Sequence, residues 1–422
     1  MNVNFYEELK SKNDIINVAN ALGFNNRGTR SCMQGDCPKH GSSGRRCLTI
    51  WPVIQGWKCF HCGQKGDVID LVMHYKNCDH RTAVRFLADR AGIPYGGGRD
   101  LTPEEIAQAE KDMKEKLLIE NILTETAEWY HAQLSMYAEI IEHLQEKNYG
   151  FSQEIIEQEK IGFAPLSKKT DHTSELADHL NSFVDFRGKL HLSGLFSFKY
   201  PSGPYYDYFR NRIVFPYWKG GKAVYMLARA TRLTPQDEFE CYNMNQANAQ
   251  ENDNGKIKYI KFKKLRVHDP SHEKKKYISR FIRNDVFLGE DTIRGADEII
   301  IAEGAPDWVS AIDKGFNAIS PVTVAFREED NEKLERLTRS AKSVYIINDN
   351  EDNKAGYKGA LKTGKYLTER GRNVFLVELP RPAGSTKIDL NEYLKDHTAD
   401  ELKGLMNNAK SIIQITLVQN RF

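Results

Sequence analysis

The chain of 422 residues is long enough for two or three domains, each with a hydrophobic core of its own. Hydrophobic residues make up 40% of it and charged residues 28%, which excludes bulk disorder. The net charge of +2 is unevenly spread, and seven cysteines are an odd number for a disulfide framework. The amino terminus lacks the apolar core of a signal peptide and no stretch is long enough to span a membrane, so we expect a cytoplasmic protein.

Two pairs of metal-binding residues come first along the chain. Cys37 and His40 are separated by two residues, and so are Cys59 and Cys62, with eighteen residues between the pairs. A two-residue gap lets both side chains of one turn reach the same ion. Three thiolates and one imidazole suit tetrahedral zinc and leave no open coordination position. The spacing therefore predicts a structural zinc site.

Three other potential ligands lie close by in the sequence. We interpret Cys32 and Cys47 as ordinary small residues, because neither sits in a paired turn. We expect the side chain of His61 to point away from the metal, because it lies between two ligands.

The residues around these pairs predict a small zinc ribbon followed by helices. Residues 47–60 alternate enough for two short strands. Asp67 and Asp79 can each cap a following helix, and Gly92 can end the second one. A proline and three glycines within 94–101 predict a linker.

Three segments resemble the zinc-binding domain of bacterial replicative primases of the DnaG class: CPKH at 37–40, WKCFHCGQKGDVIDLVMHY at 57–75 and AVRFLADRAGI at 83–93. The resemblance implies a domain that reads template DNA. Lys39 and His61 depart from the residues that are common in the family, and neither change removes a ligand. The zinc ligands that the resemblance implies are Cys37, His40, Cys59 and Cys62.

Arginines on predicted strands follow in the next part of the chain. In YYDYFRNRIVFPYW at 205–218, Arg210 and Arg212 precede an apolar run, and Arg229 lies on a following strand. Guanidinium groups bind phosphates in bidentate fashion and stay charged when partly desolvated. The alternative is a salt-bridged strand edge. The segment also resembles the polymerase core of the same primases, which favours contacts with nucleic acid or nucleotide.

A strongly basic segment lies beyond a polar insertion at 233–255. Residues 256–283 hold eleven lysines and arginines against two acids, which suggests contact with a polyanion. A solvated basic loop is the alternative. The family places a nucleotide-binding lysine in this region, and we assign it to Lys258 rather than Lys276.

Carboxylates follow three predicted strands near the end of the chain. The runs at 299–302, 343–347 and 373–380 are short and apolar, as expected for strands buried on both faces. Open α/β sheets bind ligands at the carboxyl ends of such strands, and carboxylate oxygens suit Mg²⁺. The acids near these strand ends are Glu303, Asp349, Glu351, Asp352 and Asp389.

This pattern resembles a Toprim domain, which primases share with some topoisomerases and nucleases. The middle motif, residues 348–353 after the second predicted strand, departs from the family pattern. Its second acid is a glutamate, and two residues are inserted before Ala355. We place Glu351 in the site, with Asp352 as the alternative; Asp352 and Asp307 are otherwise interpreted as helix caps or turn residues. The catalytic residues implied by position are Glu303, Asp349, Glu351 and Asp389.

The predicted fold class is multidomain, α+β and α/β, with a zinc ribbon, a basic α+β subdomain and a Rossmann-like Toprim domain. The predicted divisions are a zinc-binding domain at 1–93, a linker at 94–101, the basic subdomain at 102–290, the Toprim domain at 291–395 and a helical tail at 396–422.

The predicted function is a DNA-templated primase that joins ribonucleotides into short primers by metal-dependent nucleotidyl transfer. It would use a structural zinc ion and catalytic Mg²⁺ or Mn²⁺. Its expected partners are single-stranded DNA and ribonucleoside triphosphates, with a replicative helicase as a further candidate and no membrane. Two alternatives remain: a Toprim-type nuclease, and a primase homologue that binds nucleic acid without catalysis.

Overall fold

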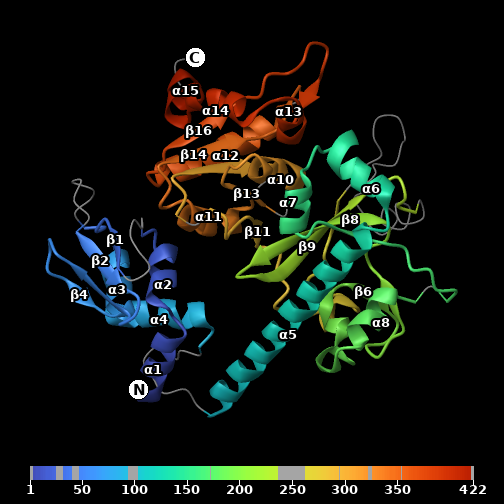
Figure 1. Cartoon of the computed structure of the whole chain (residues 1–422), viewed down its shortest axis with the longest axis horizontal. Coiled ribbons are helices and arrows are strands. Elements are labelled where there is room, and N and C mark those ends of the chain that lie inside the picture. The colour runs from blue at the N-terminus through green and yellow to red at the C-terminus, as the bar shows by residue number, and fades with distance from the viewer. Residues whose placement is uncertain are drawn as a thin grey trace. The chain divides into compact units, whose positions relative to one another are not determined.

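The computed structural model describes residues 3–24, 32–39, 47–93, 103–171, 173–235, 262–293, 295–321, 326–352 and 354–419 (Figure 1). They form two compact units, one of residues 1–114 with 294–297 and one of residues 115–293 with 298–422. Each unit has its own buried apolar cluster. The predicted ligand His40, the predicted lysine Lys258 and the linker at 94–101 lie outside the described residues.

The first unit combines a small antiparallel sheet with helices. The four strands pair in the order β1-β2-β3-β4, so the predicted hairpin is β2 and β3. Its elements are α1 (Val3–Ser11), α2 (Ile15–Ala21), β1 (Met33–Gly35), β2 (Leu48–Trp51), β3 (Gly56–Cys59), β4 (Lys65–Gly66), α3 (Val68–Lys76) and α4 (His80–Ala91).

Local capping sets the ends of α3 and α4 as the sequence predicts. The Asp67 side chain accepts hydrogen bonds from the backbone of the first turn of α3, and Asp79 accepts one from the backbone of α4. Gly92 ends α4 in the left-handed region, with φ of 64°. The apolar stripes of both helices face the core of this unit.

The second unit begins with a helical and antiparallel region. The long helix α5 (Pro103–Leu134) runs into it, and four strands pair in the order β10-β9-β8-β5. The other elements are α6 (Ala138–Glu142), η1 (His143–Lys147), α7 (Gln153–Gln158), β5 (Gly162–Ala164), α8 (Glu175–Asn181), η2 (Val184–Phe186), η3 (Leu190–Ser193), β6 (Phe196–Phe198), β7 (Tyr205–Asp207), β8 (Arg212–Lys219), β9 (Lys222–Ala230), β10 (Phe262–Lys264) and η4 (Lys275–Tyr277).

A six-stranded α/β sheet completes this unit, in the order β11-β13-β12-β14-β16-β18. The four central strands are parallel and the two edge strands antiparallel. Its strands are β11 (Phe287–Leu288), β12 (Glu298–Ala302), β13 (Ala318–Pro321), β14 (Ser343–Ile347), β16 (Val374–Val377) and β18 (Lys410–Ser411), beside a two-stranded ribbon of β15 (Asn350–Glu351) and β17 (Lys387–Ile388). Its helices are α10 (Ala305–Asp313), η5 (Glu328–Asp330), α11 (Asn331–Leu337), α12 (Ala355–Glu369), α13 (Leu390–Asp396), α14 (Ala399–Asn407) and α15 (Ile412–Gln419).

The predicted strands at 299–302 and 343–347 are confirmed as β12 and β14, and the third is the shorter β16. Sequence reasoning missed β13, whose four residues include a serine and a proline. The predicted helical tail also contributes to the sheet, because β18 pairs with β16 and is followed by α15.

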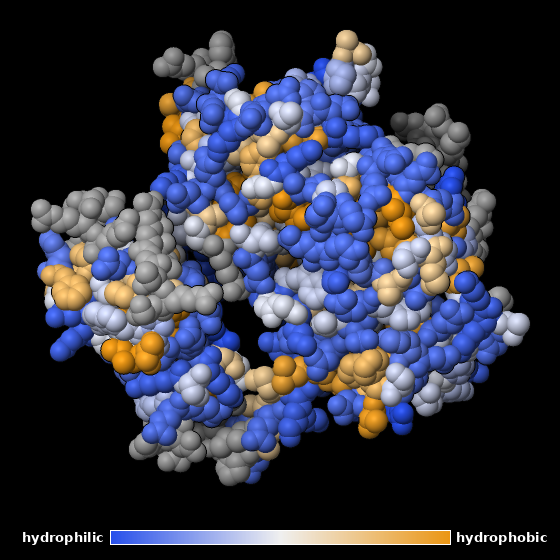
Figure 2. Space-filling view, in the orientation of Figure 1, coloured by the Kyte–Doolittle hydropathy of each residue, from blue (hydrophilic) through white to orange (hydrophobic). Residues whose placement is uncertain are grey.

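Within the described residues, no helix is long and apolar enough to cross a lipid bilayer. On the face shown in Figure 2, hydrophilic side chains predominate and apolar ones form only small groups.

Candidate functional sites

The ends of β12 and β14 bring two of the predicted acids together. The two strands are parallel neighbours, with Ala302 paired to Ile347, so both end at the same edge of the sheet. Glu303 therefore lies beside Asp349, whose backbone N–H donates to Glu303 Oε2 at 3.1 Å. Gly356 permits this approach, because a Cβ there would lie 3.2 Å from the same oxygen and 2.9 Å from the Asp349 carbonyl.

Burial and like charge disfavour ionisation of these two carboxyls. Burial, followed by the charge of Asp349, raises the pKa of Glu303 to about 7. Burial also raises the pKa of Asp349, although Lys387 opposes the shift. Carboxylates that repel one another in a half-buried site gain free energy when a cation joins them.

Two further acids stand at the start of α10 and α13. Asp389 caps α13, with its Oδ1 accepting from the backbone N–H of Glu392 at 2.8 Å. The buried Asp307 accepts from the backbone N–H groups of Gly304 at 3.1 Å and Asn391 at 3.0 Å, so it ties the two helix starts together. Burial, with the charges of Asp389 and Asp349, raises the pKa of Asp307 well above its usual range. Asp307 thus acts as a cap, as interpreted from the sequence, and also adds charge to the cluster.

The ribbon of β15 and β17 determines which middle-motif acid faces the cluster. Glu351 pairs with Lys387 across the ribbon, and its charge raises the pKa of both Glu303 and Asp349. Asp352, the next residue, is exposed and forms an ion pair with Arg381. The ribbon ends at Glu351, and Asp352 lies in the turn that follows, so only Glu351 is placed by the strand pairing.

A lysine that sequence reasoning did not single out lies at the centre of the acids. The ammonium of Lys387 pairs with Asp349, and the charges of Asp389 and Glu303 also act on it. Its position two residues before Asp389, on a strand, was the available signal. A cavity of about 360 Å³ opens beside Asp349 and Glu351. The lining includes Asn348, Asp349, Asn350, Glu351, Lys354 and Tyr357.

The donor set fits hydrated magnesium better than a closed metal cage. Among the described residues, no three of these acids bring one oxygen each within 4.8 Å of one another. Mg²⁺ keeps several waters and is usually bound through one or two carboxylates together with substrate phosphates. The spacing and the raised pKa values suit such binding.

The predicted arginines differ in their exposure. Arg212 is only 3% exposed on β8, so it contributes to packing more than the sequence suggested. Arg229 is partly exposed on β9 and lies over the ring of Tyr149, with 5.0 Å from its guanidinium carbon to the ring centre. The charges of Asp389 and Asp307 also act on Tyr149, whose pKa burial raises to about 12. Arg229 therefore stands near the acid cluster.

Part of the basic segment has a structural role. The buried Lys263 donates to the Tyr208 carbonyl at 2.6 Å, and Arg266 donates to the Gly194 carbonyl at 3.1 Å. These two cations are engaged by backbone carbonyls, so the contact with a polyanion predicted for 256–283 stays a prediction for the other basic residues of the segment. Lys276 is exposed.

The predicted cysteines converge in the first unit. The sulfurs of Cys37 and Cys62 and the Nε2 atom of His74 all lie within 4.8 Å of one another. The Cys59 thiol interacts with those of both Cys37 and Cys62. Zinc–sulfur bonds of about 2.3 Å in a tetrahedron require sulfurs in such mutual proximity, so these residues fit zinc.

Two neighbours of this cluster were not expected from the sequence. His74 lies on the buried face of α3, where a polar residue among apolar ones was the available signal. Cys47 interacts with Cys59, although no paired turn contains it. His61 is exposed, in agreement with a side chain that points away from the metal.

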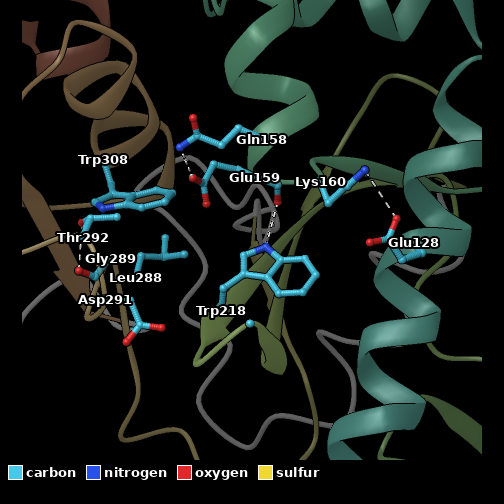
Figure 3. A pocket seen from close by; sticks show the side chains of 11 residues that line it. Glu128, Gln158, Glu159, Lys160, Trp218, Leu288, Gly289, Asp291, Thr292 and Trp308 are labelled. Atoms are coloured by element: carbon cyan, nitrogen blue, oxygen red, sulfur yellow. Dashed lines mark hydrogen bonds and ion pairs between the residues drawn. The ribbon is translucent and has the colours of Figure 1, made fainter. Parts of the chain in front are cut away.

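A second cavity of the second unit, about 340 Å³, lies between α10 and the end of the β8–β9 hairpin (Figure 3). Its polar groups are largely paired with one another. Gln158 donates to Glu159, Lys160 pairs with Glu128, and the Trp218 indole donates to the Glu159 carbonyl. Charged groups do not converge on it as they do at the acid cluster, which is therefore the stronger candidate for catalysis.

Comparisons with known proteins match family models to two parts of the chain and find relatives along most of its length. A family model described as "CHC2 zinc finger" matches residues 1–99, and one described as "DNA primase catalytic core, N-terminal domain" matches residues 129–260. A DNA primase of Staphylococcus aureus (strain MRSA252) is 25% identical over 412 residues, covering 96% of this chain and 59% of the relative. One of Listeria innocua is 26% identical over 409 residues, covering 94% and 56%. The chain thus spans less than two thirds of the length of these curated relatives.

Solved structures show the same fold. The zinc-binding and RNA polymerase domains of the Aquifex aeolicus primase align with a TM-score of 0.52 at 22% identity, covering 97% of this chain and 86% of theirs. A DnaG primase catalytic domain bound to single-stranded DNA aligns with a TM-score of 0.51 at 16% identity, covering 73% and 83%.

Proposed function

We propose that this chain, which belongs to the DnaG class of bacterial primases, synthesises short RNA primers on single-stranded DNA by metal-dependent nucleotidyl transfer. The observation that carries the proposal is the convergence of carboxylates at the neighbouring ends of β12 and β14, with burial and mutual repulsion that favour a bound cation. Ribonucleoside triphosphates are the proposed substrates, and a replicative helicase is a candidate partner.

In the proposed mechanism the acid cluster holds Mg²⁺ or Mn²⁺. Such an ion would supply positive charge to the triphosphate while the 3′-hydroxyl attacks the α-phosphate and the bond to the departing pyrophosphate breaks. Glu303 and Asp349 supply the first carboxylates, and Lys387 would exchange its ion pair with Asp349 for contacts with phosphate oxygens. The proposed ligands are Glu303, Asp349, Glu351 and Asp389, with Asp352 left outside because of its exposed pair with Arg381.

Nucleic acid is proposed to contact two surfaces. In the second unit, Arg210, Arg229 and Lys258 would bind phosphates of template or nucleotide. In the first unit, the sheet face opposite the core carries Lys58, whose ammonium lies 5.0 Å from the centre of the exposed Phe60 ring, and Lys65 directly across from Lys58. Exposed aromatic rings among cations suit stacked bases of single strands.

The zinc ion is proposed to be bound by Cys37, Cys59, Cys62 and His40. The sulfurs of Cys37 and Cys62 lie within 4.8 Å of one another, and the Cys59 thiol interacts with both. The order Cys-His-Cys-Cys matches the printed description of the family model. The site has a structural role, because four protein ligands leave no position for substrate.

The proposed divisions keep the predicted zinc-binding domain at 1–93 and the core that follows the linker. The two matched family models and the two compact units support this arrangement. The catalytic domain is extended past residue 395, because β18 belongs to its sheet.

The proposal is tested by incubating the full chain with labelled ribonucleotides, Mg²⁺ and single-stranded DNA. Primers are expected from the wild type, with a loss of roughly 100-fold or more in Asp349→Asn, which removes one anionic ligand at constant shape. Zinc content and template binding should be unchanged in this variant. Cleavage of the DNA without synthesis would indicate a nuclease, and binding alone a non-catalytic homologue.

A further inference from the structure

We propose that His74 is a positioning residue of the zinc site, with its Nε2–H donating a hydrogen bond to the zinc-bound thiolate of Cys37. The two atoms lie 3.1 Å apart. The imidazole is only 6% exposed, and the Cys37 side chain is fully buried. The inference rests on the zinc site proposed above and assigns a residue that this site does not include.

The surrounding structure fixes the orientation of the imidazole. The Trp57 ring packs against it with centres 4.8 Å apart and planes inclined at 37°. Trp57 is itself held by a hydrogen bond from its indole N–H to the Asp67 carbonyl, at 3.0 Å, where α3 begins. A capping box at Asp67 fixes that end of the helix. The rotamer of His74 is therefore restrained from two sides.

The charge of the site explains why a donor is useful there. Three thiolates around Zn²⁺ carry a net negative charge in a buried place. N–H groups directed at the sulfurs reduce the free-energy cost of burying that charge. Backbone N–H groups already serve Cys37, from Lys39, and Cys59, from His61 and Cys62. A metal-bound thiolate has no proton to give, so His74 must be the donor in its contact with Cys37.

His74 has two alternative roles, as a zinc ligand or as an ordinary core histidine, and each has a different consequence. As a ligand it would follow all three cysteines, twelve residues after Cys62, whereas the matched family has its histidine between the first and second cysteines. As an ordinary core histidine it would contribute packing against Trp57 and leave the metal unaffected.

The first measurement is the zinc affinity of the full chain, by competition with a chromophoric chelator. His74→Leu replaces the imidazole with an apolar side chain of similar bulk that has no donor, and we expect zinc affinity to fall by roughly 10- to 100-fold. His74→Gln, whose amide can donate to sulfur, should recover part of this loss. His61→Ala is the matched control, because it removes an exposed histidine between two ligands, and its affinity should equal that of the wild type.

The second measurement is the alkylation rate of Cys37 in the zinc-loaded protein, followed by peptide mass spectrometry. A hydrogen bond withdraws electron density from sulfur, so its loss in His74→Leu should speed alkylation of Cys37 several-fold. His61→Ala, the matched control, should show the wild-type rate of Cys37 alkylation. His74→Met, which also lacks a donor and is unbranched, takes the place of the leucine variant if that variant fails to fold, with the same expected losses.

Three results would overturn the inference. Wild-type affinity and alkylation in both His74 variants would make His74 a core histidine. An X-ray absorption spectrum with one zinc-bound nitrogen fewer in His74→Gln or His74→Leu would make it a ligand. A wild-type protein without zinc would overturn the zinc site itself, which is a separate failure from the first two.

Discussion

Glu303 carries the clearest pH-dependent prediction at the scale of single residues. Its pKa of about 7 lies above the ordinary value of 4.5, so the folded state binds this proton more tightly than the unfolded state. The contribution of the protonated Glu303 carboxyl to the free energy of unfolding is complete below pH about 4.5. It is lost as the pH rises through about 7. In magnesium-free buffer at pH 8, Glu303→Gln should therefore be more stable than the wild type by about 1–2 kcal/mol, allowing for partial exposure.

Urea unfolding at pH 8 and pH 5 measures this difference, which should shrink at the lower pH. Glu328→Gln is the control, because that carboxylate is 82% exposed in its ion pair with Lys362 and should change little at either pH. A Glu303→Gln variant less stable than the wild type at pH 8 would contradict the assigned repulsion.

The adjacent acids Glu351 and Asp352 form a natural pair of test positions. Glu351→Gln should reduce primer synthesis at least about 10-fold, because the charge of Glu351 acts on the cluster. Asp352→Asn should remain within about 2-fold of the wild type, because an exposed ion pair such as the one with Arg381 contributes about 0–1 kcal/mol. Initial rates under saturating Mg²⁺ provide the comparison, and the reverse order would move Asp352 into the site.

At the scale of elements, we expect the segment of β18 and α15 to stabilise the edge of the six-stranded sheet, because β18 pairs with β16. Ile412 is only 2% exposed, and its side chain lies so close to Gly364 of α12 that a Cβ there would stand 2.6 Å from Ile412 Cδ1. Ile412→Ala should cost about 2–4 kcal/mol of unfolding free energy through lost burial and a cavity. Ile413→Ala, at a side chain 58% exposed, should cost less than about 0.5 kcal/mol. Equal effects in denaturant titrations would contradict the docking of this segment.

At the scale of the whole molecule, the two units should respond separately to loss of zinc. Cys62→Ser removes one proposed thiolate, so zinc should be lost and amide exchange should accelerate across the described parts of 32–93. Residues 298–419 should keep their protection, because they have their own core. Hydrogen exchange with metal analysis measures both, with Cys78→Ser as the control at a half-buried free cysteine. Unfolding of both units together would contradict their independence.

The sequence by itself determined the features that depend on neighbours along the chain. The paired spacing around Cys37 and Cys59, the caps at Asp67 and Asp79, and the strands that precede Glu303 and Asp349 are local patterns. Periodicity and capping act over a few residues, so one sequence suffices to predict them.

Only the tertiary structure decided which side chains meet across elements distant in sequence. It paired Lys387 with Asp349 and Arg381 with Asp352. The second ion pair distinguishes Asp352 from its neighbour Glu351. The tertiary structure also brought His74 to Cys37 and joined β18 to the edge of the sheet. These contacts arise from packing between segments that can be tens of residues apart, where short-range sequence patterns carry no information about partners.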